Sequence, residues 1–369
     1  MLRAASLLRS AARDVPSLCT KGKVSDRRLT RTGCFPCLPR ALAFPDARGI
    51  AQVISSGPAN PCQPVWKEAR GEAANHPSSR VNWPRDVVFG NRSVKLTAHY
   101  YRQHDADLTG DVPAETFGGW QQRLLCVPKQ ESALVVMHAW NAGLDERLPY
   151  DPGSPYAGWY RMAEYLQRAI CISREVLPPL IAAARETGFN VIHVSSGDYA
   201  KRFPGYKLAA GLAGPAPEPP AGAPGSAVRD QWCSERYAQS HGAHNLADID
   251  AGCKLLDFPP QAMPLDDEPV VLRSHELHAV CRDRGVWHLI YCGFAINWCL
   301  LLSPGGMVDM SRLGYTCSAV RDAVTAVENR ETARRELCKA EALWRVALAF
   351  GYVFDSADLI AGVRADAGS

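Results

Sequence analysis

The sequence lacks any run of roughly 18 or more apolar residues, the length that a membrane-spanning helix needs. Its strongest apolar stretches, such as 289–292 and 300–302, are far shorter. It also has little excess charge, because 41 Lys and Arg against 38 Asp and Glu leave a formal net charge of +3. Proteins that bind nucleic acid usually carry a concentrated basic face. We therefore expect a cytoplasmic protein with no nucleic-acid partner and no membrane partner.

A disulfide framework is missing as well. The 13 cysteines are odd in number and are spread through a chain that is too long to need such crosslinks. Cys171, Cys292 and Cys338 lie in apolar surroundings, where a free cysteine behaves as a small hydrophobic residue. Cys34 and Cys37 have CxxC spacing, but a structural zinc site needs four ligands and no second pair follows. These features indicate a reducing compartment and a coincidental CxxC.

The first 80 residues differ in composition from the rest of the chain. Residues 1–13 contain Arg3, Arg9 and Arg13 without an acidic residue, which is typical of an organellar transit peptide. Pro, Gly, Ser and Arg then recur without a period, as in disordered segments. Translation from a wrongly chosen start codon would explain the same composition. We expect 1–80 to be such a leader and 81–131 to be an irregular lead-in that packs on the following domain.

Strands and helices alternate from about Ser132 onward. The continuous apolar run at 133–137 predicts a strand buried on both faces, and 191–194 is expected to form the next strand. The helical spacing of apolar residues between them predicts a helix over 173–187. This order predicts a right-handed βαβ unit. Further strands are expected at 270–272, 287–292, 315–320 and 352–354, and further helices at 275–284, 297–313, 331–350 and from Ser356.

This alternation predicts a three-layer α/β/α, Rossmann-like domain over 132–369, with a mostly parallel sheet of about six strands. The segment 209–227 is rich in Pro, Ala and Gly and predicts a surface loop. The chain from there to Asp267 is polar, and we expect it to be irregular.

A cysteine follows one of these strands at the point where a helix is expected to begin. Parallel sheets bind ligands at the carboxyl ends of their strands. Cys299 lies in the segment Tyr291–Cys299, which leaves such an end. A cysteine in the first turn of a helix has a lowered pKa, and free backbone N–H groups beside it can stabilise an oxyanion. A buried structural cysteine is the alternative interpretation of the same pattern.

The segment resembles the turn that carries the nucleophile in the isochorismatase-like cysteine hydrolases. Gly293 and Cys299 match the glycine and the cysteine of that turn. The resemblance extends to Ala133–Asn141, Leu177–Gly188 and Arg321–Ala323, in the same order along roughly the last 230 residues. It implies that Cys299 is the nucleophile and that the Phe294–Ala295 peptide bond is cis. Gly293, Phe294, Ala295 and Trp298 then form the turn around the oxyanion.

The family's catalytic triad is aspartate, lysine and cysteine, and this sequence departs from it at two positions. His138 stands at the aspartate position, and Arg273 stands nearest to the lysine position. Ile296 also replaces the threonine of the turn. Imidazole can activate a thiol, and arginine can hold an anion firmly. Two functions stay open: a cysteine hydrolase that acts on a small amide, ester or related substrate, and a catalytically degenerate member that binds a ligand or serves as a scaffold.

Three further expectations concern ligands and partners. Nicotinamidases of this family bind a metal after the second strand, but Ser195–Tyr199 contains no histidine there, and His241 and His244 lack a third ligand. We expect no metal and no other cofactor. A weak aromatic signal places Trp140, Asn141 and Trp159 around a substrate pocket.

We also expect a homo-oligomer, because family members commonly associate. The helix at 331–350 has a broad apolar stripe, which either a partner subunit or the lead-in at 81–131 covers. The stripe consists of Leu337, Ala340, Leu343, Trp344, Ala347 and Leu348.

Overall fold

The structure, a computed structural model, describes residues 93–367 apart from 105, 152, 154–162, 219–221 and 223–224. The described residues belong to one compact unit. The leader at 1–80, the CxxC motif and Trp159 lie outside the described residues, so the expectations about them stay predictions.

Within the described chain the sheet has eight strands in the order β2-β1-β8-β7-β6-β3-β4-β5. Six of them are parallel to one another, and these are the strands that the sequence predicted. The mostly parallel sheet is therefore confirmed. The parallel strands are β3 (Ser132–Met137), β4 (Asn190–Val194), β5 (Val270–Val271), β6 (His288–Phe294), β7 (Thr316–Thr325) and β8 (Val353–Phe354).

The other two strands correct the expectation of an irregular lead-in. β1 (Ser93–Arg102) and β2 (Gly119–Pro128) form an antiparallel hairpin, and β1 joins the sheet where His99 pairs with Val353. Val94, Leu96 and Ala98 are buried, while Ser93, Lys95 and Thr97 between them are more exposed. This alternation is typical of a strand with one buried face, and the aromatic and polar residues around it obscured the period.

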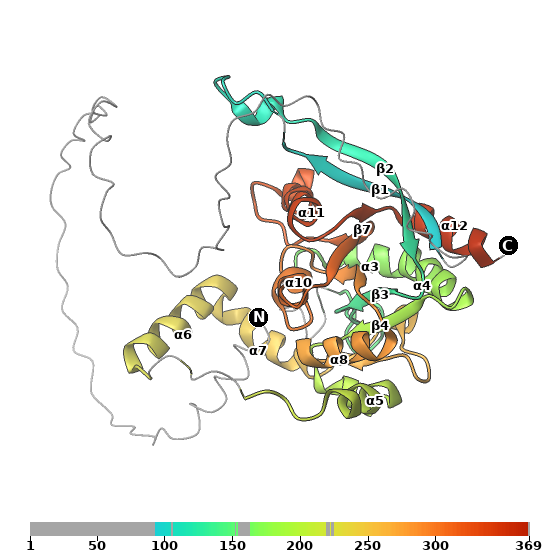
Figure 1. Cartoon of the computed structure of the whole chain (residues 1–369). Coiled ribbons are helices and arrows are strands. Elements are labelled where there is room, and N and C mark those ends of the chain that lie inside the picture. Colours follow the sequence, from blue (N-terminus) through green and yellow to red (C-terminus); the bar gives the residue numbers. More distant parts are fainter. Residues whose placement is uncertain are drawn as a thin grey trace, which may run out of the picture. The chain divides into compact units, whose positions relative to one another are not determined.

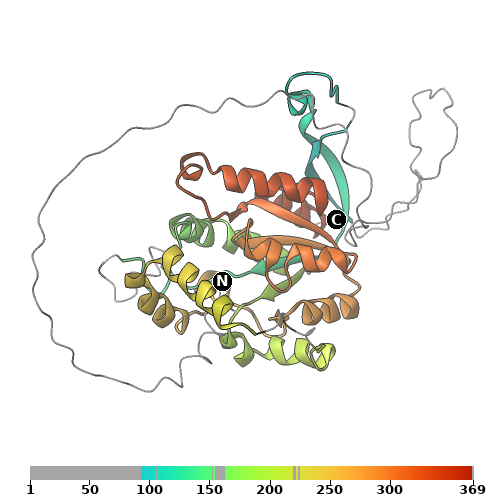
Figure 2. The same ribbon diagram turned by 90° about the vertical axis from the view of Figure 1, so that its left-hand side faces the viewer.

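Helices cover both faces of the sheet, as Figures 1 and 2 show. On β3, Leu134 and Val136 point to one face, while Val135 and Met137 point to the other. The first face packs against α3 (Leu166–Glu175), α4 (Leu177–Glu186) and α12 (Ser356–Ala367). The second packs against α5 (Pro204–Ala213), α8 (Ser274–Arg284), α10 (Met307–Arg312) and α11 (Leu337–Ala349). The predicted three-layer α/β/α architecture is confirmed.

Two of the predicted helices are broken in the structure. The helix expected at 173–187 is two helices, α3 and α4, which meet at Val176 just before two prolines that begin α4. The helix expected at 297–313 is likewise split into α9 (Cys299–Leu302) and α10, because Pro304 and Gly305, with φ at 80°, lie between them. Proline removes a helical N–H, and glycine readily adopts positive φ.

The middle of the chain is more helical than the sequence indicated. α5 continues through Ala213, so the Pro/Ala/Gly-rich loop begins later than predicted, at Gly214. α6 (Ala227–His241) and α7 (Ala243–Cys253) occupy a region that we expected to be irregular. Short 3-10 helices complete the described elements: η1 (Pro113–Thr116), η2 (Asp198–Arg202), η3 (Pro260–Ala262) and η4 (Ala333–Arg335).

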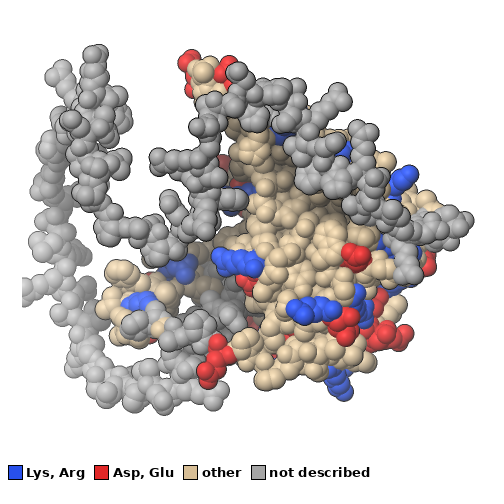
Figure 3. All heavy atoms as spheres, in the orientation of Figure 1, with Lys and Arg blue, Asp and Glu red and all other residues tan. Residues whose placement is uncertain are grey.

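No helix among the described residues is long and apolar enough to cross a membrane. On the face shown in Figure 3, basic and acidic side chains are interspersed among uncharged ones.

The apolar stripe of α11 is covered in part by the hairpin. Tyr101 of β1 lies edge-on between two indoles, with its ring centroid 6.2 Å from that of Trp344 and 5.6 Å from that of Trp120. Leu343 is buried, while Leu337 and Leu348 stay exposed at the ends of the stripe. The lead-in thus covers the side of α11 that carries Trp344.

This packing predicts that Trp344→Ala lowers the free energy of unfolding by about 2–3 kcal/mol, because a half-buried aromatic ring loses its partners. Arg345→Ala is the matched control on the same helix, since its exposed ion pair with Glu341 contributes less than about 1 kcal/mol. Urea denaturation measures both variants. Equal losses in the two would show that the hairpin contact stabilises nothing.

Candidate active site

The site begins where the ends of β3 and β6 touch. Gly293 pairs with Met137 across the parallel strands and has φ at 115°. A Cβ at Gly293 would lie 1.9 Å from the Met137 carbonyl oxygen, a distance that no side chain tolerates. Glycine is therefore required here both by the backbone angle and by the close approach. This contact brings the segment that follows β6 beside the residue that follows β3.

That residue is His138. Its backbone has φ at 53°, an uncommon angle for a residue with a side chain, and its N–H donates to the Val194 carbonyl at 2.9 Å. The imidazole is buried and stacks on Trp140, with ring centroids 5.6 Å apart and planes inclined by 17°. Its Nδ1 is buried and has no hydrogen-bond partner among the described residues. The stack with Trp140, rather than a hydrogen bond at Nδ1, fixes the orientation of the ring.

The turn after β6 is fastened to the end of β7. The Phe294–Ala295 bond is cis, as the resemblance implied. The Ile296 N–H donates to the Thr325 carbonyl at 2.8 Å. Asn297 forms two hydrogen bonds with Val327, one to its carbonyl at 2.8 Å and one from its N–H at 2.9 Å. These bonds hold the backbone immediately before Cys299 in place.

A bulge in β7 allows this fastening. The pairing of β6 with β7 shifts between Tyr291 and Gly293, so that Gly293 faces Val324. The additional residues include Arg321 and Asp322, which are held by Asp355 and Ser356 at the start of α12. A bulge redirects the strand that contains it, and here it carries Thr325 to the turn. The Arg321–Ala323 part of the resemblance thus lies in this bulge.

Cys299 begins α9 and is partly exposed. Burial by itself would raise the pKa of its thiol, but the charge of His138 and a hydrogen bond with its side chain act in the opposite direction. Hydrogen bonds from the Ser303 hydroxyl and the Ala295 backbone also favour the thiolate. Together with His138, they lower the pKa of the thiol from an ordinary value of 9.0 to about 7. The thiol therefore ionises more readily than a free cysteine, in contact with an imidazole.

Two neighbours of the thiol were not found from the sequence. Tyr165, just before α3, is buried with its ring centroid 6.4 Å from that of Phe294. Burial raises the pKa of its hydroxyl far above the usual range, and the charge of Cys299 adds to this rise, so the two groups interact electrostatically. Ser303 is four residues after Cys299, on the same side of one helical turn. That spacing was the available signal, whereas nothing in the sequence indicated Tyr165.

The other predicted site residues are placed as follows. Arg273 is exposed at the start of α8, and no hydrogen bond or ion pair joins it to His138 or Cys299 in the described chain. Asn141 is buried, and its amide binds the backbone of Leu255 and Asp257 and the Asp145 carboxylate, so it holds loops together.

Trp298, next to Cys299, is 45% exposed. The backbone N–H of Trp298 donates to the Ala295 carbonyl at 3.1 Å. This backbone N–H is therefore engaged within the turn.

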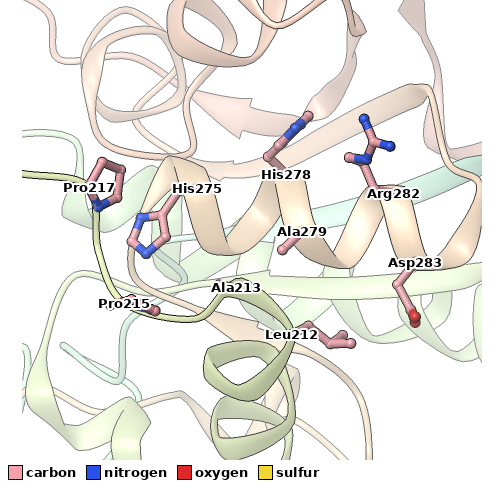
Figure 4. A pocket seen from close by; sticks show the side chains of 9 residues that line it. All are labelled: Leu212, Ala213, Pro215, Pro217, His275, His278, Ala279, Arg282 and Asp283. Carbon is pink, nitrogen blue, oxygen red and sulfur yellow. The ribbon is translucent and has the colours of Figure 1, made fainter.

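No group of three or more His, Cys, Asp or Glu residues in the described part of the chain could hold a metal ion. A surface pocket of about 500 Å³ lies elsewhere, between the end of α5 and α8 (Figure 4). Neither His138 nor Cys299 lines it. Its lining consists of Leu212, Ala213, Pro215, Pro217, His275, His278, Ala279, Arg282 and Asp283.

Neither a protein-family model nor a curated protein matches the chain. Solved structures that match include a cysteine hydrolase from Pseudomonas syringae pv. phaseolicola 1448A, at 17% identity over 65% of this chain and 95% of that one, with a TM-score of 0.39. An isochorismatase family protein from Burkholderia thailandensis matches at 18% identity over 64% and 96%, with a TM-score of 0.35. N-carbamoylsarcosine amidase from Thermoplasma acidophilum matches at 16% identity over 61% of this chain and 96% of that one, with a TM-score of 0.33. These neighbours are isochorismatase-family cysteine hydrolases and related amidases, and likeness at this level carries no information about activity.

The contact between β3 and β6 predicts that Gly293→Ala lowers the free energy of unfolding by more than about 3 kcal/mol, because a methyl group would overlap a backbone oxygen. Gly314→Ala is the control, since Gly314 has a positive φ of 94° but open space around it, and should cost only about 1–2 kcal/mol. Thermal or urea unfolding compares the two. Losses of equal size would mean that the backbone angle alone, and not the close approach, requires Gly293.

Proposed function

We propose that the protein is a cysteine hydrolase that acts on a small amide, ester or related acyl compound. The observation that carries this proposal is the thiol of Cys299, whose pKa of about 7 results from its contact with His138 in spite of burial. A partly exposed thiol of lowered pKa is typical of a nucleophile, whereas burial raises the pKa of the structural cysteines here, as at Cys281, to about 12.

In the first half of the reaction the Cys299 sulfur attacks the carbonyl carbon as a thiolate, with its proton held by His138. A C–S bond forms, and the carbonyl π electrons move to oxygen to give an oxyanion. The Ala295 backbone beside the sulfur is our candidate for stabilising that charge. The oxyanion then collapses and breaks the bond to the leaving nitrogen or oxygen, which takes the proton from His138.

In the second half a water molecule attacks the thioester. His138 accepts the proton from that water, the C–S bond breaks, and the sulfur leaves as thiolate or regains the proton. The products are a carboxylic acid and an amine or alcohol, and the protein returns to its initial state. His138 thus serves as base and acid in turn, the role that imidazole has in cysteine–histidine pairs of other folds.

Arg273 stays our candidate for binding an anionic part of the substrate. It follows β5, whose carboxyl end lies at the same edge of the sheet as those of β3 and β6. Its guanidinium is exposed and would hold a carboxylate through two parallel hydrogen bonds.

The second candidate function is ligand binding or scaffolding without catalysis. It is favoured by the buried Nδ1 of His138, which has no partner within the described residues. In cysteine–histidine enzymes a third group orients the imidazole from that side, and here only the stack with Trp140 does so. This alternative predicts a ligand that is bound near Cys299 and released unchanged.

Incubation with a panel of small amides, ureas and esters tests the proposal. We expect at least one of them to be hydrolysed, with a thioester on Cys299 that rapid acid quenching and intact-mass measurement detect. His138→Ala should reduce kcat by about a hundredfold or more, the usual contribution of a general base. Cys299→Ala should abolish both the turnover and the adduct.

Cys338→Ala is the matched control, because Cys338 is another half-buried thiol, located on α11. It should leave turnover unchanged. Turnover that survives in Cys299→Ala would contradict the proposal, and binding of a panel member without any product would favour the second candidate function.

We further infer that the chain forms a homo-oligomer, supported by Leu337 and Leu348, which stay exposed on α11 beside the covered part of the stripe. Sedimentation velocity at micromolar concentration should show a species larger than one chain. A single species near 40.3 kDa that persists over a wide dilution range would contradict this inference.

A further inference from the structure

A second group of polar side chains lies at the carboxyl end of β4, beside the stacked pair His138 and Trp140. It consists of Ser195, Ser196 and Tyr199, in the segment that leads into η2. The Tyr199 hydroxyl is close enough to Ser195, Trp140 and Ser196 for all three to affect its ionisation. These side chains therefore converge on one place.

Hydrogen bonding within this group is incomplete. Ser196 Oγ and Tyr199 Oη are buried, and neither has a partner with hydrogen-bond geometry in the described chain. A buried hydroxyl without a partner costs about 1–3 kcal/mol, and most buried polar atoms in proteins are satisfied. Burial also raises the pKa of Tyr199 to about 12, so its hydroxyl is protonated and able to donate. Ser196 and Tyr199 thus each keep a buried hydroxyl whose hydrogen-bonding capacity is not used by a partner of good geometry in the described chain.

The ring of Tyr199 is held where it is by its surroundings. One edge packs so closely on Gly197 that a Cβ there would lie 2.6 Å from the ring. The ring also meets Phe258 edge-on, with centroids 5.2 Å apart. The hydroxyl therefore cannot swing away to find another partner. Such an arrangement is pre-organised for an external group.

Trp140 connects this group to the reactive pair. Its indole stacks on His138, and the same side chain interacts with the Tyr199 hydroxyl. His138 in turn contacts Cys299. Trp140 thus links the pair that contains the sulfur to the Tyr199 hydroxyl.

We propose that Ser196 and Tyr199 form a subsite that binds an uncharged group with both hydrogen-bond donors and acceptors, such as a primary carboxamide or a urea, of the molecule that Cys299 attacks. This inference rests on the proposed function. Hydroxyls donate and accept, which matches the N–H and C=O of an amide. A carboxylate is disfavoured, because the group itself contains no cation and burial of an unpaired charge is costly.

Alkylation of Cys299 by chloroacetamide, which carries a primary amide, tests the subsite in the full-length protein. The sulfur displaces chloride from the CH₂ carbon, and the thiol proton passes to His138. Iodoethane, which lacks a polar group, alkylates the same sulfur and serves as the reference reagent. Intact mass with Cys299→Ala as background reports the rate at this residue for both reagents.

We expect inactivation by chloroacetamide to saturate, and Ser196→Ala and Tyr199→Phe each to raise the concentration for half-maximal inactivation by about fivefold or more. The limiting rate and the rate with iodoethane should be unchanged. Tyr206→Phe, on α5, is the matched control and should have no effect. An unchanged half-maximal concentration in both variants, or equal slowing with the two reagents, would overturn the subsite.

A wild-type thiol that reacts slowly with both reagents would instead contradict the proposed function. In that case binding of acetamide to the Cys299→Ala protein, measured by NMR, decides on the subsite. Binding that Tyr199→Phe weakens supports it. Equal binding in the two proteins, or none, means that the hydroxyls bind water only, and overturns it.

Discussion

The close approach of Gly293 to the Met137 carbonyl is the contact on which the rest of the site depends. Two neighbouring parallel strands end at this point, and a side chain at Gly293 would separate them. Because the strands meet, the residue after β3 and the turn after β6 share one corner of the sheet. The bulge in β7 and the hydrogen bonds of Asn297 then fasten that turn from the other side.

The electrostatics of the thiol follow from this geometry. Burial penalises a thiolate, yet the pKa of Cys299 is lowered because His138 lies next to it. The effect depends on one cationic partner in partly dehydrated surroundings, where charges interact more strongly than in water. The ring that provides this charge is fixed by a stack with Trp140 and not by a third polar residue.

The sequence predicted the parts of this structure that repeat a regular pattern. Apolar-rich segments that alternate with helical patterns located all six parallel strands, and the resemblance at Gly293 and Cys299 located the turn. The hairpin of β1 and β2 was missed although Val94, Leu96 and Ala98 alternate, because a single short alternation among aromatic residues is a weak signal. Tyr165 and Asn297 could not be placed beside Phe294 and Val327 from the sequence, since both contacts depend on three-dimensional packing. Arg273 was selected by alignment, and its exposed side chain shows no bond to the reactive pair within the described residues.

The central claim is that His138 makes Cys299 a thiolate near neutral pH, and a titration of the thiolate tests it most directly. The ultraviolet absorbance of thiolate is followed against pH in the wild-type protein and in Cys299→Ala, and the difference isolates one residue. Deprotonation of Cys299 should have a midpoint near pH 7, and His138→Ala should move that midpoint upward, toward or beyond the ordinary value of 9.0. A midpoint near 9 in the wild-type protein, or one that His138→Ala leaves in place, would contradict the claim.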